Sequence, residues 1–300
     1  MTALVERLTT NSALNRLYHE HRDGHPLPSS KVLEEIVEIM RAIVFPGYFG
    51  KSNIILHSLE YPVGANLQTL RELLVDQVLA GLCFAQNGVS DESDTCLCCL
   101  REKAEEITMK VLERLPELQE ILATDVEAAY NGDPAADSYG EIISCYPVIR
   151  VLTSYRLAHE LYVLGVPLIP RIITEIAHSE TGIDIHPGAQ IGHHFTIDHG
   201  TGVVIGATCI IGNNVKLYQG VTLGAKSFPL DENGNPIKGI PRHPILEDDV
   251  IVYSNATVLG RITIARGTVI GGNIWVTEST EPGEHIVQNC RRMVSNSRGT

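Results

Sequence analysis

The stretch IHPGAQIGHHFTI, residues 185–197, has an aliphatic residue at every sixth position. The same spacing continues through most of the C-terminal half. The aliphatic residues at this period are Ile185, Ile191, Ile197, Ile205, Ile211, Leu217, Leu223, Leu246, Val252, Val258, Ile264 and Ile270. A period of six matches neither a helix nor an isolated strand, but it is typical of a solenoid of short strands. With three hexapeptides in each coil, we expect a triangular prism of about 18 residues per coil, with these aliphatic residues pointing inward.

The residues before the solenoid lack this period and predict helices. Apolar residues recur at helical spacing in five segments, which are 31–45, 66–86, 95–115, 118–130 and 142–164. Segment 167–179, which begins with two nearby prolines, is expected to link the two parts. The predicted fold class is therefore α+β. An N-terminal all-α domain (1–175) precedes a parallel β-helix (176–290) with a loop excursion at 225–245, and a tail follows (291–300).

The composition limits the kind of partner. A formal net charge of −13 over 300 residues argues against nucleic acid or an anionic membrane surface as the main partner. No apolar run approaches the roughly 18 residues that would span a bilayer, and no charged-then-apolar leader opens the chain. We therefore expect a cytoplasmic protein that binds neither nucleic acid nor a membrane.

Three of the seven cysteines, Cys96, Cys98 and Cys99, form a cluster that resembles part of a metal site. If residues 94–115 are helical, however, Cys96 and Cys98 point to different faces of the helix. No fourth ligand stands nearby at zinc-like spacing. The prediction is that these thiols hold no metal, which leaves their role open.

The first break in the period lies between Ile197 and Ile205, where eight residues stand in place of six. The two extra residues must bulge, and the bulge contains Asp198 and His199 beside two glycines. Asp184 lies fifteen residues before His199, so it can lie on the neighbouring rung. A carboxylate bonded to one imidazole nitrogen raises the basicity of the other, and an oriented imidazole is the usual device for activating an alcohol.

The second break is the excursion at 225–245, which returns through Arg242 and His243. A loop of this length inside a repeat array is usually functional. The guanidinium of Arg242 suits a carboxylate, and His243 offers a second donor or base. A solvated loop with a favourable charge is an equally good interpretation of this segment alone.

A zinc-dependent hydratase is another enzyme built on such a solenoid, and it needs three histidines around one metal. His193, His194 and His199 raise this alternative. Because His193 and His194 are consecutive on one expected strand, their side chains should diverge, which argues against it.

The motifs of the two breaks occur together with two others: DIHPGA (184–189), IDHGTG (197–202), VTLG (221–224) and RHP (242–244). Over about residues 125–275 the chain resembles the serine O-acetyltransferases of the hexapeptide-repeat acyltransferase superfamily. The resemblance implies a left-handed β-helix. It also implies transfer of acetyl from acetyl-CoA to the hydroxyl of L-serine, the first step of cysteine biosynthesis. The nearest alternatives are an acetyltransferase for a sugar or another hydroxylated amino acid, and a scaffold solenoid without turnover.

The resemblance also implies residue roles. His199 would be the general base, Asp184 would orient it, and Arg242 and His243 would hold the serine carboxylate. Asp133 and Asp198 would face the serine ammonium group. The positions that correspond to acetyl-CoA contacts are Gly224, Ala225, Ser254 and Gly272, and no metal is expected. Cys209 would be a wall residue.

The same resemblance implies a homotrimer or a dimer of trimers, with CoA in the groove between neighbouring prisms. Many members also bind O-acetylserine sulfhydrylase through a terminal isoleucine. This chain ends in Arg298-Gly299-Thr300, and the missing isoleucine argues against that complex.

Overall fold

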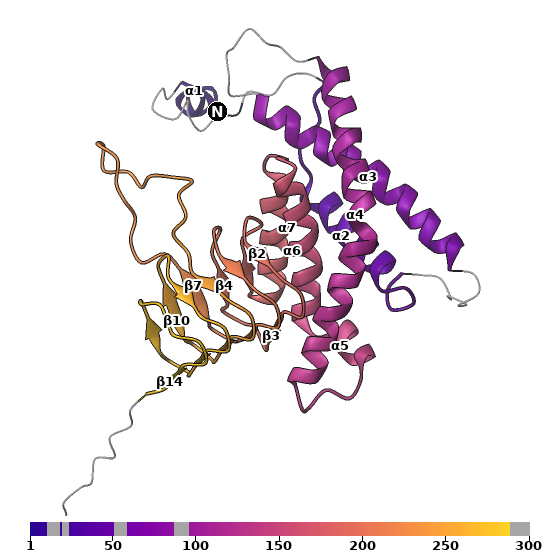
Figure 1. The fold of residues 1–300 in the computed structure, drawn as a ribbon. Coiled ribbons are helices and arrows are strands. Elements are labelled where there is room, and N and C mark those ends of the chain that lie inside the picture. The colour runs from indigo at the N-terminus through magenta and orange to yellow at the C-terminus, as the bar shows by residue number, and fades with distance from the viewer. Residues whose placement is uncertain (11–18, 20–23, 51–58, 87–95, 289–300) are drawn as a thin grey trace, which may run out of the picture.

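The computed structural model describes residues 1–10, 19, 24–50, 59–86 and 96–288 and contains a helical part followed by a prism of strands (Figure 1). The helices are α1 (Thr2–Thr9), α2 (Ser30–Val44), α3 (Glu60–Gln86), α4 (Leu97–Gly132), α5 (Tyr139–Cys145), α6 (Pro147–Val163) and α7 (Ile169–Thr181). The predicted tail 291–300 lies outside the described residues. None of the helices in these described residues is both long and apolar enough to cross a membrane.

The helix α2 shows how local sequence sets these elements. Ser29 caps its first turn by accepting the Val32 N–H at 3.4 Å. Leu33, Ile36 and Met40 then place a fully buried stripe against α3 and its neighbours. The helix ends at Val44, two residues before Pro46.

Two prolines place helix boundaries differently from the sequence prediction. The predicted helices 95–115 and 118–130 are one helix, α4, which continues through Pro116. The predicted helix 142–164 is two, because the residue before Pro147 is pushed out of the helical region and Tyr146 is extended. The segment 167–179, which was predicted to link the two parts, contains most of the helix α7 (Ile169–Thr181), which packs against α6 and β1.

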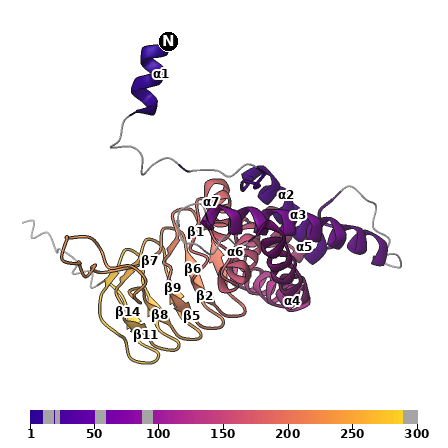
Figure 2. The same ribbon diagram turned by 90° about the horizontal axis from the view of Figure 1, so that it is seen from above.

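The remaining residues form a parallel β-helix, which Figure 2 shows as a stack of coils beside the helices. Its strands are β1 (Asp184–Ile185), β2 (Gln190–Ile191), β3 (Thr196–Asp198), β4 (Val204–Ile205), β5 (Ile210–Ile211), β6 (Lys216–Tyr218), β7 (Thr222–Gly224), β8 (Ile245–Leu246), β9 (Ile251–Val252), β10 (Thr257–Leu259), β11 (Thr263–Ile264), β12 (Val269–Ile270), β13 (Trp275–Val276) and β14 (His285–Ile286). They make three sheets in the orders β1-β4-β7-β10-β13, β11-β8-β5-β2 and β14-β12-β9-β6-β3. The predicted fold class is confirmed.

The aliphatic period is the core of this prism. Residues one coil apart stack in register, as in the column Ile185, Ile205, Leu223 and Val258. Every residue of the period is buried except Ile191, which is partly buried against the same core. Burial of one such side chain contributes about 1.5–3 kcal/mol, so the repeat itself supplies the driving force for the stack.

A buried ion pair joins the helices to the first coil. Arg156 of α6 donates to both oxygens of Asp125 in α4, at 2.9 and 3.1 Å, and Asp125 is fully buried. The same guanidinium donates to the carbonyls of Ile191 and Gly192, and Asp125 accepts the Phe195 N–H. Because these polar groups satisfy one another, α4, α6 and the first coil are held as one unit.

Candidate active site

The first break in the aliphatic period is a swollen corner of the prism. Twenty residues separate Ile185 from its stacked neighbour Ile205, whereas eighteen separate Ile205 from Leu223. The extra residues follow β3, where His199 and Gly200 have φ values of 57° and 95°. The left-handed backbone carries the His199 side chain out of the prism, and 72% of that side chain is exposed.

Acidic groups lie beside this imidazole. Asp198 has a carboxylate oxygen 3.8 Å from His199 Nε2. Asp133, the residue after α4, accepts hydrogen bonds from Tyr146 Oη at 2.5 Å and from the Ala135 N–H at 2.8 Å. The bond from Tyr146 lowers the pKa of Asp133 and raises the pKa of Tyr146 to about 12. Asp133 is therefore held as an anion close to the bulge.

Lys216 and Tyr146 belong to this group, although the sequence analysis identified neither. Lys216, in β6, donates to the Gly132 carbonyl at 2.5 Å and lies 3.5 Å from Asp198 Oδ2. Its ammonium also stacks over the Tyr218 ring at 4.5 Å. Lys216 thus joins the C-terminal end of α4 to the strand before the bulge. We call residues 198–202, with Asp133, Tyr146 and Lys216, the His199 corner.

The Asp184 side chain does not pair with His199 in this structure. Its ion-pair partner is Arg171 of α7 at 3.6 Å, and Arg171 also binds Glu175. The main chain of Asp184 is nevertheless next to the bulge, since its N–H donates to the Val203 carbonyl at 2.9 Å. The predicted orienting role of Asp184 remains a prediction.

The second break returns to the prism at the adjacent corner. Thr208 Oγ1 accepts the N–H groups of Arg242 and His243 at 3.0 and 3.1 Å, and Arg261 donates to the carbonyls of Thr208 and His243. The His243 ring packs over Gly206, where a Cβ would lie only 2.0 Å from the ring, so only glycine fits there. We call residues 186–188, 206–208, 224–225, 242–244 and 260–261 the His243 corner.

The environment of His243 sets its protonation. Its Nδ1 accepts the Thr208 N–H at 3.1 Å, so the neutral ring carries its proton on Nε2. Burial, with the charge of Arg242 adding to it, lowers the pKa of His243 to about 4. His243 is therefore a neutral donor near physiological pH. The Nε of Arg242 is buried and has no hydrogen-bond partner among the described residues.

The four predicted CoA contacts divide between the two edges of the prism on which the two corners lie. Ser254 stacks next to Gly272, because the Ser254 carbonyl accepts the Asn273 N–H at 2.9 Å, and both follow strands of the sheet that contains β3. They continue the edge of the prism that begins at the His199 corner. Gly224 and Ala225 lie at the other edge, where the Gly224 carbonyl accepts the Gly260 N–H at 3.0 Å. In the described residues no hydrogen bond or ion pair joins the two corners.

The other histidines, carboxylates and cysteine of the prism that could take part in chemistry lie outside the two corners or have other partners. The His194 ring lies 3.3 Å from Glu127 of α4, and the main-chain N–H of His193 donates to Asn213 Oδ1. Glu175, His178 and Asp184 could together surround a cation, but the guanidinium of Arg171 already lies among them. Burial raises the pKa of Cys209 to about 12, which makes it a poor nucleophile and fits the predicted wall position.

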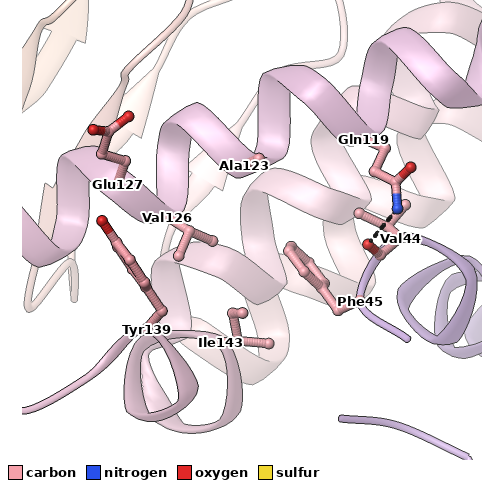
Figure 3. A pocket seen from close by; sticks show the side chains of 8 residues that line it. All are labelled: Val44, Phe45, Gln119, Ala123, Val126, Glu127, Tyr139 and Ile143. Carbon is pink, nitrogen blue, oxygen red and sulfur yellow. Dashed lines mark hydrogen bonds between the residues drawn. The ribbon is translucent and has the colours of Figure 1, made fainter. Parts of the chain in front are cut away.

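The helical part contains an apolar hollow of about 600 Å³ (Figure 3). It is lined by Val44, Phe45, Gln119, Ala123, Val126, Glu127, Tyr139 and Ile143. Its polar groups are few, and Gln119 donates across it to the Val44 carbonyl at 3.0 Å. No residue of the two corners lines this hollow, so it is separate from the candidate active site.

Known proteins resemble the chain over nearly its whole length. A plasmid-encoded serine acetyltransferase of Synechococcus elongatus is 50% identical over 264 residues, which is 88% of this chain and 82% of that protein. The chain belongs to the serine acetyltransferase family. A serine acetyltransferase of Bacillus licheniformis is 44% identical over 181 residues, covering 58% of this chain and 80% of that protein. No family model matches the chain.

Solved serine acetyltransferases share the fold. Serine acetyltransferase 1 of Entamoeba histolytica, solved in complex with L-cysteine, has a TM-score of 0.73 at 35% identity and covers 95% of this chain and 94% of its own. Membership of this family makes the chain an acyltransferase, and the family uses acetyl-CoA as its co-substrate. The predicted family and enzyme class are therefore confirmed, whereas the residue roles within the two corners remain predictions.

Proposed function

We propose that the chain transfers acetyl from acetyl-CoA to the hydroxyl of L-serine, giving O-acetyl-L-serine and CoA, with His199 as the general base. The observation that carries this proposal is the exposed imidazole of His199, which lies 3.8 Å from the Asp198 carboxylate and close enough to Asp133 to affect its charge. Asp133 and Asp198 provide the negative charge that a serine ammonium needs. His199 then takes the proton from the serine hydroxyl as that oxygen attacks the thioester carbonyl, and CoA leaves as its thiolate.

The His243 corner is proposed to bind the other end of serine. Arg242 brings a guanidinium whose Nε has no hydrogen-bond partner among the described residues, and the neutral His243 ring presents its Nε2–H near pH 7. A cation and a neutral donor together suit a carboxylate. Opposite charges at the two ends of a zwitterion fix the hydroxyl between them, and such orientation supplies much of the rate of a bimolecular transfer.

The His199 corner and the His243 corner lie on two different edges of one prism. We therefore propose that a complete active site forms between two chains. In a ring with threefold symmetry, the His199 corner of one chain faces the His243 corner of the next. Ser254 and Gly272 then line one wall of the groove, and Gly224 and Ala225 line the other. Small residues on both walls allow the pantetheine arm of acetyl-CoA to approach the backbone closely.

Asp184 is proposed to orient His199 when the site is complete. Its main chain lies on the rung beside the bulge, and the His199 side chain is exposed there. In the single chain, the Asp184 carboxylate is paired with Arg171.

Thiol release from acetyl-CoA with a panel of acceptors tests this function. The panel contains L-serine, other hydroxylated amino acids and sugars. We expect turnover with L-serine, and we expect His199→Ala to lower kcat on the order of 10²–10⁴-fold, as is usual for loss of a general base. The side chain is exposed in the single chain, so the fold of that chain should not change. Near-normal turnover by His199→Ala would exclude the base role, and preference for a sugar would exclude the substrate.

A further inference from the structure

The start of α4 brings together three cysteine sulfurs that the proposed reaction does not use. Cys96 lies within 2.8 Å, sulfur to sulfur, of Cys99, and forms a disulfide with Cys98. The ligand atoms of all three lie within 4.8 Å of one another, and all three residues are exposed. The sequence argument that Cys96 and Cys98 diverge is wrong. The helix begins only at Leu97, and Cys96 is extended, with φ −61° and ψ 152°.

The position of Cys96 is what makes the sulfurs converge. Cys96 is the N-cap of α4, and its Sγ accepts the Cys99 N–H at 3.3 Å. An N-cap side chain folds back over the first turn, where Cys98 and Cys99 already point outward. The N-terminal end of a helix carries a partial positive charge, which favours the negative charge that metal-bound thiolates carry.

We propose that the reduced Cys96, Cys98 and Cys99 bind one soft metal ion per chain, and that this ion is Cu(I). Thiolates are soft ligands that select Cu(I), Zn²⁺ or iron–sulfur clusters. A structural zinc ion takes four ligands, whereas only these three residues form the group among the described residues. Cu(I) is satisfied by three thiolates. The thiols release their protons as the ion binds, and the disulfide form lacks two of the three ligands.

This site is distant from both corners of the prism. Asp125, where α4 meets the first coil, lies 28 residues after Leu97, which is roughly 40 Å along a helix. Figure 1 shows α4 running from the N-terminal helices down to β3. Metal binding at Cys96 should therefore leave the basal acetyl transfer unchanged.

The experiment titrates the full chain with Cu(I) under anaerobic conditions. A phosphine reductant first supplies the two electrons that cleave the Cys96–Cys98 disulfide, becoming a phosphine oxide with oxygen from water. The protein then competes with a chromophoric Cu(I) chelator. We expect one Cu(I) held per chain, with thiolate-to-metal absorption in the near ultraviolet. The Cys96→Ser variant should lose this ion without loss of helix, because serine is a good N-cap. The Cys98→Ser and Cys99→Ser variants should lose it as well.

The matched control is Cys145→Ser, which removes an exposed free cysteine outside the cluster. This variant should keep the ion. The proposal is overturned if the reduced wild-type chain yields all its Cu(I) to the chelator, or if the triple serine variant retains as much as the wild type. It is also overturned if Zn²⁺ displaces the bound Cu(I) at equal concentration.

Discussion

At the scale of single residues, Lys216 is the least expected member of the site. Its ammonium holds the Gly132 carbonyl at the end of α4 and the carboxylate of Asp198. It therefore fixes where Asp133 and Asp198 lie relative to each other, and both are proposed to bind the serine ammonium. Lys216 acts through these groups and is a positioning residue.

We predict that Lys216→Met raises the KM for serine on the order of tenfold, the equivalent of one charge-assisted hydrogen bond at about 1.4 kcal/mol. The KM for acetyl-CoA should stay the same, because its proposed contacts lie on other coils. Lys216→Arg should restore part of the serine affinity. The matched control is Lys110→Met, which removes an exposed lysine of α4 whose ion-pair partner is Glu106. An unchanged serine KM in Lys216→Met would rule out positioning.

The sequence predicted Asp198 and His199 because a repeat makes a two-residue insertion visible. Lys216 and Tyr146 carry no such signal. Lys216 meets Gly132 across 84 residues, and Tyr146 meets Asp133 only because the chain turns between α4 and α5. Contacts of this kind depend on how the helices dock on the first coil, and neither the period nor a local motif records that docking.

At the scale of elements, the strand boundaries were predicted from the local period, whereas the helix boundaries depend on tertiary packing. The strands of the prism follow directly from burial at every sixth residue. In the helical part, the prediction ended a helix before Pro116 and continued one through Pro147, whereas the structure shows the reverse. Pro116 is tolerated inside α4, whose neighbouring turns are buried at Leu115 and Leu118, so packing outweighs one missing hydrogen bond. Pro147 begins α6 instead, because proline suits the first turn of a helix.

The loop that returns at His243 gives the fold a pH dependence. The pKa of His243 is about 4 in the folded chain, against 6.5 for an unperturbed histidine. Below pH 6.5 the His243 imidazole binds a proton in the unfolded chain but stays neutral in the folded chain. The free energy of unfolding should therefore fall as the pH drops from 6.5 toward 4. At pH 5 the loss from this group should be on the order of 2 kcal/mol.

The measurement compares urea unfolding of the wild type and His243→Asn between pH 7 and pH 5, at one protein concentration. Asparagine keeps an acceptor for the Thr208 N–H but does not titrate. The variant should therefore lose less stability over this range, while all other groups cancel in the difference. Equal losses in the two proteins would show that His243 does not resist protonation.

At the scale of the whole molecule, the proposed site needs His199 from one chain and Arg242 from the next. His199→Ala and Arg242→Ala should each be nearly inactive alone at moderate serine concentration. When the two variants are co-expressed in equal amounts and assemble at random, about a quarter of the interfaces combine an intact His199 corner with an intact His243 corner. We predict that the mixture regains about a quarter of the wild-type activity for the same reason.

The matched control mixes the wild type with the double variant His199→Ala/Arg242→Ala. A site shared between chains again leaves about a quarter of the sites intact, whereas a site within one chain leaves about half. The two mixtures should therefore have equal activity if the site is shared. If the site lies within one chain, the first mixture stays inactive and the second keeps half, which would contradict the shared site while leaving the general-base role of His199 untouched. The edges of the prism that carry His199 and Arg242 are separated by the packed core. A side-chain movement within one chain therefore cannot bring the two residues together, and we expect the two mixtures to be equally active.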